Sequence, residues 1–359
     1  MTTSFYKNKK ILITGHTGFK GSWLTLFLTE LGAQVMGISL PPKTSKDFYV
    51  VNNLDRFCNS HISDISDYQT IQKKIAQFQP DLIFHLAAQS LVRYSYMNPL
   101  ETYQTNVMGT VNLLESIKNI KSKCAIVVIT TDKVYENKEW NYPYRENDRL
   151  GGKDPYSASK ACVELLVSSY QHSFFHQQDF ENHQKAIATA RAGNVIGGGD
   201  WSEDRLIPDI IKAIESDTEI IIRNPESIRP WQYVLEPLSG YLLLAEKLYN
   251  DPTKYSGAWN FGPYPEEVVS VEEVVKTAIS ILEKGRYRIE KKINAAHEAT
   301  LLKLDISNAL NILHWEPVLN TNDAIRWTIE WYKELKNNKD SIQEYSKKSI
   351  HDYLNRIEL

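Results

Sequence analysis

Short apolar runs and amphipathic segments alternate along the first half of the chain. The run at 11–13 predicts a buried strand, and Leu24, Leu28 and Leu31 share one face of a helix that Gly32 ends. Further strands are predicted at 35–39, in a short piece before Asp64, and at 81–85, 125–130 and 186–191. Further helices are predicted at 68–78, 99–118 and 155–175, with a loop over 41–60. This alternation predicts an α/β fold with a parallel sheet covered on both faces.

The pattern changes after Gly193. A glycine-rich loop follows at 197–201, and the predicted elements are then helices at 208–214, 238–249, 271–282 and 321–336 and a strand at 219–222. We expect a doubly wound sheet domain over 1–192, to which 235–265 returns, and a smaller C-terminal substrate-binding lobe made of 193–234 and 266–359. Ligands of open α/β sheets bind at the carboxyl ends of the strands, so the cleft between the two parts is the expected site.

The composition argues against several classes of function. The chain has 359 residues and a formal charge of -3, with dispersed lysines and arginines, which argues against nucleic acid as a partner. Its three cysteines have no C-x-x-C spacing, and His172 and His176 are interpreted as a solvated helix end, so no metal site is expected. No apolar stretch reaches the ~20 residues of a membrane span, and the first strand begins too early for a signal peptide. A cytoplasmic protein is expected.

Three glycines at a spacing of three lie between the first predicted strand and the first predicted helix. Gly15 is expected to form a tight turn, Gly18 to let the backbone approach a pyrophosphate, and Gly21 to let helix and strand pack closely. An ordinary loop is the alternative, but the flanking strand and helix favour a dinucleotide-binding turn of the Rossmann type. The second strand ends at Ser39, where an acid for the adenosine 2′-hydroxyl is usual, so this position leaves NAD against NADP open.

Tyr156 and Lys160 lie one turn apart on the same face of a predicted helix. A tyrosine has a pKa of about 10, and lowering it to about 7 requires about 4 kcal/mol of preferential stabilisation of the phenolate. A neighbouring ammonium group in a low-dielectric site supplies part of that stabilisation. Only this pair follows both a dinucleotide turn and a strand that ends in hydroxyl residues. The same spacing elsewhere is interpreted as surface pairs, at Tyr6/Lys10, Tyr287/Lys291 and Tyr332/Lys336.

The order of these motifs resembles the extended short-chain dehydrogenase/reductase family, in its nucleotide-sugar branch. The likeness rests on the glycine turn, Leu86-Ala-Ala, Thr130-Thr-Asp and Tyr156-x-x-x-Lys160, and it covers essentially the whole chain. Three longer segments are more specific and resemble the members of that branch that dehydrate CDP-glucose: GGKDPYSASK (151–160), RAGNVIGGGDW (191–201) and RPWQYVLEP (229–237). The resemblance implies a Rossmann-type fold, NAD as cofactor and CDP-glucose as substrate.

The resemblance also implies catalytic roles for five residues, Lys160 among them. Tyr156 takes the proton of the sugar 4-hydroxyl during oxidation at C4, Thr131 hydrogen-bonds the 4-oxygen, and Asp132 protonates the leaving 6-hydroxyl. Lys133 stands where dTDP-glucose dehydratases have Glu, and is either the base for C5 or a charge that stabilises the enolate. A surface ion pair is the structural alternative for Asp132 and Lys133.

Two rival functions are weighed on the same residues. A nucleotide-sugar 4-epimerase returns hydride to C4 and needs no acid at the position of Asp132, so Asp132 favours dehydration. A dinucleotide-sensing protein of the same fold would usually lose Tyr156 or Lys160, and both are present here. A dehydratase for another nucleotide sugar also stays open, because nothing in the spacing of the residues identifies the base.

Further contacts follow from the resemblance. The expected cofactor contacts are Gly15, Thr17, Gly18, Phe19, Gly21, Ser39, Asp64, Ile65, Leu86, Ala87, Ala88, Asn106, Thr130, Tyr156 and Lys160. Asp64 also fits a surface turn, Ala87 and Ala88 also fit core packing, and Asn106 is expected to brace the active-site strand. The expected substrate contacts are Asn194, Arg205, Leu206 and Arg229, with the Arg229 guanidinium on the pyrophosphate. A homodimer is expected through the helices at 99–118 and 155–175.

Overall fold

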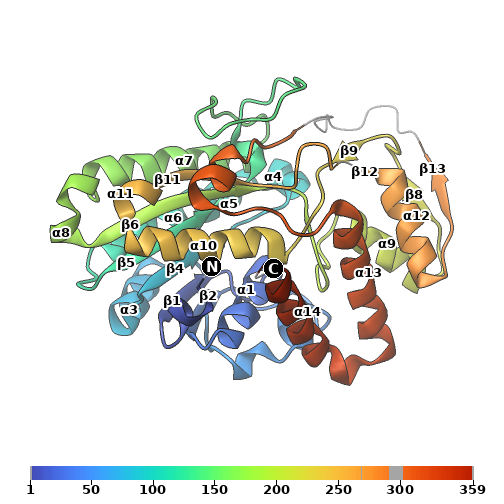
Figure 1. The fold of residues 1–359 in the computed structure, drawn as a ribbon, viewed down its shortest axis with the longest axis horizontal. Helices are drawn as coiled ribbons and strands as arrows, with labels where there is room; N and C mark the ends of the chain where they lie inside the picture. The colour runs from blue at the N-terminus through green and yellow to red at the C-terminus, as the bar shows by residue number, and fades with distance from the viewer. Residues whose placement is uncertain (1, 268, 291–301, 358–359) are drawn as a thin grey trace.

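The computed structural model of the protein describes residues 2–267, 269–290 and 302–357. Its centre is a seven-stranded parallel sheet in the order β11-β6-β5-β4-β1-β2-β3 (Figure 1). The sheet strands are β1 (Lys10–Thr14), β2 (Gln34–Ser39), β3 (Asn59–Ile62), β4 (Leu82–His85), β5 (Cys124–Ile129), β6 (Lys185–Ala192) and β11 (Gly257–Phe261). The predicted doubly wound, Rossmann-type fold is confirmed.

The strands are buried on both faces, which explains their continuous apolar runs. In β1, Ile11 and Ile13 point into one core and Leu12 points into the other. Ile11 pairs with Val35 of β2 and with Leu82 of β4, so β4, β1 and β2 run parallel in register. Their carboxyl ends therefore meet at one edge of the sheet.

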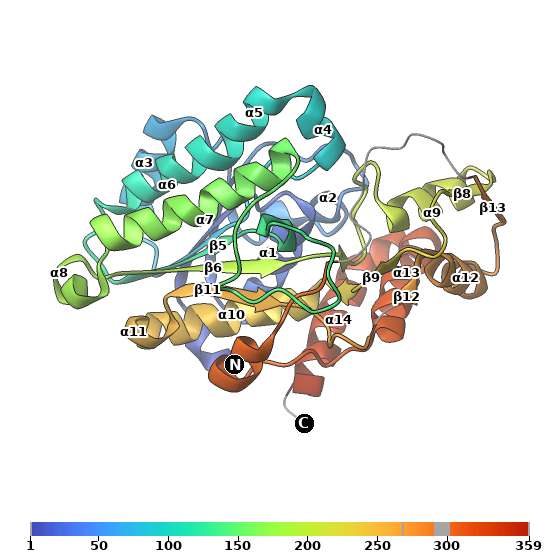
Figure 2. The same cartoon turned by 90° about the horizontal axis from the view of Figure 1, so that it is seen from above.

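Helices cover both faces of the sheet (Figure 2). The second core includes residues of α3, α6 and α7, and the first includes residues of α1, α10, α13 and α14. The helices are α1 (Phe19–Glu30), α2 (Phe48–Val51), α3 (Tyr68–Phe78), α4 (Val92–Met97), α5 (Pro99–Tyr103), α6 (Gly109–Ile117), α7 (Pro155–Ser173), α8 (Phe180–His183), α9 (Leu206–Glu215), α10 (Leu235–Asn250), α11 (Pro252–Tyr255), α12 (Val271–Leu282), α13 (Thr321–Asn337) and α14 (Ile342–Ile357).

Some elements differ from the sequence expectation. Residues 41–60 contain the short helix α2, whose Phe48 fits between Trp23 and Trp331, so the segment is not wholly loop. The helix predicted at 99–118 is interrupted by a π-helical turn at Gln104–Met108 that contains Asn106. Such wider turns often mark functional positions, and residue periodicity alone does not reveal them.

The part after β6 forms a second group of elements at one end of the sheet, on the right of Figure 1. Helices α9, α12 and α13 lie there with short paired strands: β7 (Val195–Ile196) with β10 (Gln232–Tyr233), β8 (Ile220–Ile222) with β13 (Tyr287–Ile289), and β9 (Ile228–Arg229) with β12 (Val269–Ser270). Helix α10 and strand β11 belong to the sheet unit, as expected for 235–265. The domain boundaries themselves stay a prediction.

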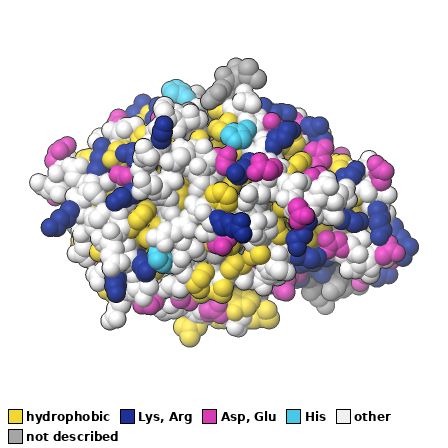
Figure 3. Space-filling view, turned by 90° about the horizontal axis from the view of Figure 1, so that it is seen from below, with side chains coloured by type: hydrophobic (Ala, Val, Ile, Leu, Met, Phe, Trp, Pro, Cys, Tyr) yellow, Lys and Arg dark blue, Asp and Glu magenta, His cyan; other side chains and the backbone are white. Residues whose placement is uncertain are grey.

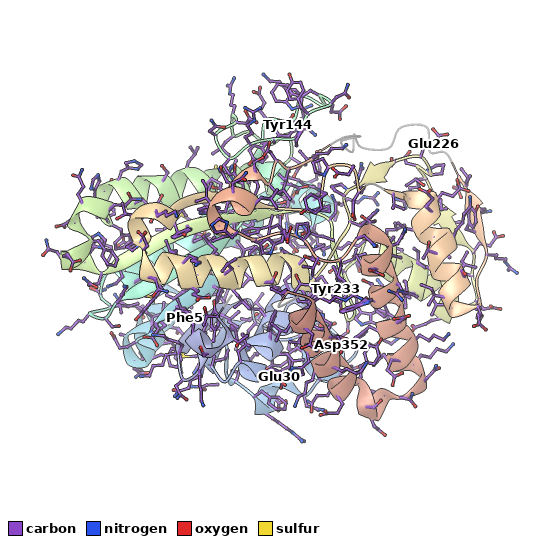
Figure 4. The ribbon with its side chains drawn as sticks, viewed as in Figure 1. Phe5, Glu30, Tyr144, Glu226, Tyr233 and Asp352 are labelled. Carbon is purple, nitrogen blue, oxygen red and sulfur yellow. The ribbon has the colours of Figure 1, made fainter. Side chains whose placement is uncertain are left out.

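Helix α14 departs from the lobe to which 266–359 was expected to contribute. It lies against α1, where Lys347 and His351 both approach the Glu30 carboxylate, at 3.4 Å and 3.1 Å. Figure 4 labels Glu30 and, on the neighbouring α14, Asp352. Helix α14 therefore lies on the sheet unit, and α13 and α14 connect the two parts.

Candidate active site

The glycine turn after β1 has no room for side chains. Gly15 has a φ of +79°, and a Cβ on it would lie 2.7 Å from the Ala87 nitrogen. A Cβ on Gly21 would lie 2.0 Å from the Gly15 carbonyl oxygen, so α1 packs directly on the turn. Gly18 precedes α1 and supplies no side-chain cap, which leaves the first amide groups of the helix to face an anion. These residues and the adjoining Phe19 fit the pyrophosphate of a dinucleotide.

The end of β2 contacts the same turn. The Thr17 hydroxyl lies 2.8 Å from the Ser39 hydroxyl and donates to the Leu40 carbonyl at 2.7 Å. Asp64, at the end of β3, is exposed, and its carboxylate accepts from the Ser66 amide at 2.8 Å. The side chain of Ile65 is buried against Gly109 of α6. Thr17 and Ser39 are therefore brought together, whereas the Asp64 carboxylate closes its own turn.

The segment after β4 is held by Asn106. The Asn106 amide donates to the Gln89 carbonyl at 3.0 Å and to the Ser159 hydroxyl of α7 at 2.8 Å, and its oxygen accepts from the Gln89 amide at 2.8 Å. Asn106 therefore joins the 86–90 segment to α7, rather than bracing the end of β5. Leu86 and Ala87 lie against Gly15, which places this segment, including Ala88, beside the dinucleotide turn.

Tyr156 lies buried at the start of α7, beside the residues that follow β5. Asp154 caps the helix by accepting from the Ser157 amide at 2.9 Å, and Pro155 occupies the first turn. Burial raises the pKa of Tyr156 to about 12, while a hydrogen bond with Thr131 and the charge of Arg205 act in the opposite direction. A phenolate at neutral pH therefore requires further positive charge near the ring.

Lys160, one turn along α7, is the residue predicted to supply such a charge. It is buried, and its ammonium donates to the Ile129 carbonyl at the end of β5, at 3.0 Å. Burial lowers the pKa of Lys160 to about 8, and the nearby Glu164 carboxylate works against that shift. The lysine therefore stays largely protonated at pH 7, one turn from Tyr156.

Asp132 and Lys133 differ sharply in their surroundings. The Asp132 carboxylate is buried and accepts from the Thr131 hydroxyl at 2.8 Å. The Lys133 side chain is exposed. The alternative of a surface ion pair between Asp132 and Lys133 is therefore wrong, because Asp132 is buried together with Thr131 and Tyr156.

Gly193, which is not among the predicted site residues, shapes the space for Asp132. A Cβ on Gly193 would lie 2.1 Å from an Asp132 carboxylate oxygen. Gly193 comes directly after β6, within the motif RAGN. The segment after β6 therefore has no side chain at the point where the Asp132 carboxylate, which follows β5, needs space.

We expect Gly193→Ala to reduce turnover about 100-fold, because the new methyl group must displace the Asp132 carboxylate from its position. Steady-state assays with the nucleotide-sugar substrate measure the effect. Gly262→Ala is the matched control: Gly262 lines the same small pocket, but the nearest atom to its added Cβ is 3.7 Å away. Equal losses in the two variants would contradict this role of Gly193.

A buried ion pair links the catalytic helix to the sheet. Glu164 of α7 accepts from Arg191 of β6 through Nε and Nη2, both at 2.9 Å, and both side chains are 4% exposed. The same carboxylate accepts from the hydroxyls of Thr130, after β5, and Thr189, in β6. The Thr130 hydroxyl thus faces α7. Glu164 lies one turn after Lys160 and was not among the residues predicted from the sequence.

Removing the charge of Glu164 tests its effect on Lys160. The carboxylate raises the pKa of Lys160, so in Glu164→Gln the lysine should lose its proton at lower pH. The alkaline limb of the activity profile is then expected to move down by about one pH unit. Thr189→Val, which removes one hydrogen bond to the same carboxylate without a change of charge, should leave the limb in place. A uniform loss of activity at every pH would indicate a purely structural role.

The residues expected to bind substrate are spread along one edge of the second group of elements. Arg205, just before α9 and its first residue Leu206, forms an ion pair with Asp200 at 3.0 Å, and its charge acts on Tyr156. Asn194 has a φ of +49°, and its carbonyl accepts from the Gln232 amide at 3.2 Å. Arg229 lies in β9. Of these four residues, Arg205 carries a charge that acts on Tyr156.

Lys20 is a further residue of this group that the sequence reading passed over. It lies between Phe19 and Gly21 in the dinucleotide turn, and its ammonium donates to the Tyr241 hydroxyl of α10 at 3.3 Å. Burial lowers the pKa of Lys20 to about 7, and the charges of Arg205 and Lys160 add to that shift. The sequence offered one signal for Lys20: a cation is unfavourable at the start of a helix, so a lysine there calls for an explanation.

Metal-binding clusters and membrane-spanning helices are both absent from the described part of the chain. No group of three His, Cys, Asp or Glu side chains there is arranged to hold a metal ion. No helix within 2–267, 269–290 or 302–357 is long and apolar enough to cross a membrane.

Comparison with known proteins gives consistent similarities. The sequence model of a family described as GDP-mannose 4,6 dehydratase matches residues 12–328. The CDP-glucose 4,6-dehydratase of Salmonella typhimurium is 47% identical over 351 residues, which cover 98% of this chain and 98% of that protein. A UDP-glucose 4-epimerase of Mycoplasma pneumoniae is 24% identical over 344 residues, 91% of this chain and 98% of that protein.

Solved structures show the same fold at lower sequence identity. The UDP-glucose-4-epimerase of Stenotrophomonas maltophila, with bound NAD and formylated UDP-arabinopyranose, superposes with a TM-score of 0.78 and 21% identity. The match covers 92% of this chain and 99% of that one.

Proposed function

Since the chain belongs to the GDP-mannose 4,6-dehydratase family of extended short-chain dehydrogenases/reductases, we propose that it is an NAD-dependent CDP-glucose 4,6-dehydratase. The reaction converts CDP-glucose to CDP-4-keto-6-deoxyglucose and water. One observation carries the proposal beyond the family: a buried carboxylate, Asp132, hydrogen-bonds Thr131 in the same group as Tyr156. An acid at this place serves a dehydration, and an epimerisation does not need it.

The first step removes a proton and a hydride at C4. Tyr156 accepts the proton of the 4-hydroxyl, and the charge of Arg205 favours its phenolate. We assign the same role to Lys160, which lies one turn along α7. Thr131, which contacts Tyr156, hydrogen-bonds the 4-oxygen in this proposal. The glycine turn Gly15, Gly18 and Gly21 would hold NAD, which would supply an acceptor for the C4 hydride and a donor for the hydride at C6.

The second step eliminates water across C5–C6. The 4-ketone acidifies the C5 proton, and Asp132 protonates the leaving 6-hydroxyl. We assign Lys133 to the C5 side of this step, as base or as the cation that faces the enolate. Exchange of the C5 proton with deuterated water separates the two roles in Lys133→Arg, which keeps the positive charge but cannot act as a base at neutral pH. Exchange is abolished if Lys133 is the base and persists if it stabilises the enolate.

The substrate is tested by incubating the protein and NAD with CDP-glucose and, separately, with UDP-, dTDP- and GDP-glucose. The product is followed by mass and by the alkali-induced absorbance of a 4-keto sugar. We expect CDP-glucose alone to lose one water. An isomer of unchanged mass would move the assignment to an epimerase, and no conversion of any sugar despite bound NAD would favour a dinucleotide-sensing protein.

We also propose that the protein is a homodimer in the cytoplasm. The second copy would cover exposed apolar side chains on α4, α5 and the π-helical turn, namely Tyr96, Met97, Leu100, Tyr103 and Met108. Hydrophobic side chains gather at one edge of the molecule in Figure 3. Leu100 is 82% exposed and Met97 72% exposed. The three cysteines, all unpaired, support a reducing compartment.

The dimer is tested by Leu100→Glu, which places a charge in this patch and is expected to shift the protein from dimer to monomer in analytical ultracentrifugation. Ile221→Glu, at an exposed position on β8 outside the patch, is the control and should leave the mass unchanged. A monomeric wild-type protein would overturn the proposal outright.

A further inference from the structure

Lys20 has no part in the chemistry described above, yet its ammonium lies inside the catalytic group. It is the second residue of α1, and its side chain extends to Tyr241, a fully buried residue of α10. The ammonium is 5.6 Å from the centre of the Tyr241 ring, which itself packs edge-on against Phe261 of β11. Lys20 is therefore held on a rigid support rather than extended into solvent.

The surroundings of Lys20 come from several elements. The charged and titratable groups that act on it or on its partner Tyr241 are Asp132, Tyr156, Lys160 and Arg205. Helices α1 and α10 cover one face of the sheet and α7 covers the other. Lys20 and the pair Tyr156/Lys160 therefore approach the carboxyl edge of the sheet from opposite faces.

This arrangement restricts where the nicotinamide ring of NAD goes, and this step rests on the proposed function. Oxidation at C4 requires the ring to meet the sugar beside the Tyr156 hydroxyl. The dinucleotide is anchored at the glycine turn, directly next to Lys20. A ring that satisfies both conditions lies within the group of charges to which Lys20 belongs.

We propose that the charge on Lys20 sets the relative affinity of the site for oxidised and reduced nicotinamide. The oxidised ring carries a positive charge and the reduced ring carries none. A protonated Lys20 therefore repels only the oxidised form. A neutral Lys20 has no charge with which to favour one form over the other.

The proton on Lys20 is lost within the working range of an enzyme. Burial, with smaller effects of the Arg205 and Lys160 charges, lowers the pKa of Lys20 to about 7, and the Asp132 carboxylate works against that shift. Below that pKa the lysine is charged and oxidised cofactor is disfavoured; above it the amine is neutral and the penalty disappears. Lys20 thereby makes the oxidising strength of the bound cofactor greater at acid pH.

A simpler role is an ion pair with the cofactor pyrophosphate. Both redox forms carry the same pyrophosphate, so an ion pair would strengthen the binding of NAD⁺ and NADH equally. The ratio of the two dissociation constants thus separates a pyrophosphate contact from an effect on the ring.

The test measures the dissociation constants of NAD⁺ and NADH by calorimetry at pH 6 and pH 9. At pH 6 the ratio of the NAD⁺ to the NADH constant is expected to be about tenfold higher in the wild type than in Lys20→Met. At pH 9 the two proteins should agree, whereas Lys20→Arg, which stays charged, should keep the high ratio at both pH values. Lys160 and Tyr156 are present in all three proteins, so the variants differ only at position 20.

Lys10→Met is the matched control, since Lys10 is exposed at the opposite, amino end of β1 and should change neither constant. Retained NADH binding shows that each variant is folded. Equal changes in both constants, or the same ratio in wild type and Lys20→Met at pH 6, would overturn the proposal. No sugar is present in this measurement, so an incorrect substrate assignment would appear in the product assay and leave the ratio unaffected.

Discussion

Replacing Tyr156 by phenylalanine is expected to lower turnover of CDP-glucose by about 10²–10⁴-fold, because the 4-hydroxyl then has no group to accept its proton. The reason lies in the geometry: Tyr156 is buried, contacts Thr131 and has Lys160 one turn away on α7. Removing one oxygen atom leaves the packing of the ring unchanged. Turnover is measured from the alkali-induced absorbance of the product, and NADH binding serves as the check on folding.

Tyr170→Phe provides the control for this result. Tyr170 lies on the same helix, but its hydroxyl donates to Glu115 at 2.7 Å, away from the catalytic group. Its activity should stay within about twofold of the wild type, as is usual for changes remote from the chemistry. A Tyr156→Phe protein with near-normal turnover would mean that another group accepts the proton, and the roles of Thr131 and Lys160 would then need reassignment.

Asp132→Asn is expected to separate the two halves of the reaction. The amide cannot donate the proton that the leaving 6-hydroxyl requires, so formation of the 6-deoxy product should fall by about 10²–10⁴-fold. Oxidation at C4 uses Tyr156 and Thr131 and should continue. NADH formed during a single turnover is measured by its absorbance, and loss of water is measured by mass.

Asp148→Asn is the matched control for that variant, because Asp148 accepts from the Arg145 amide in a surface turn and should not affect either step. Oxidation and dehydration falling together in Asp132→Asn would contradict a separate role for Asp132 in the elimination. Such a result would instead fit a carboxylate whose main task is to orient Thr131 through their 2.8 Å hydrogen bond.

Much of the fold could be predicted from the sequence, because the signals that define its elements are local. The predicted helices at 68–78 and 271–282 coincide with α3 and α12, each of which has an apolar face and a side-chain cap, Asp67 and Ser270 respectively. Helix α14 was harder to predict, since its sequence is largely polar and its partner, α1, is more than 300 residues away in the sequence. Strand β11 is short, and it can be recognised by its pairing with β6 but not by its own pattern of apolar and polar residues.

The site could be predicted where a motif marks it and not where packing decides it. The glycine turn, Tyr156 and Lys160 stand in recognisable spacings. The contact between Gly193 and Asp132 joins the ends of β5 and β6 and is invisible until the sheet is assembled. Glu164 is similar: its four hydrogen bonds reach Thr130, Thr189 and Arg191, and only the pairing of β5 with β6 brings those partners together.

The central claim is that one molecule of bound NAD takes a hydride from C4 and returns it to C6 of the same sugar. The most direct test uses CDP-glucose that carries deuterium at C4, followed by mass spectrometry and NMR of the product. We predict a product that has lost one water and carries the deuterium at C6. Deuterium that stays at C4 in a product of unchanged mass, or that is lost from the sugar altogether, would contradict the account.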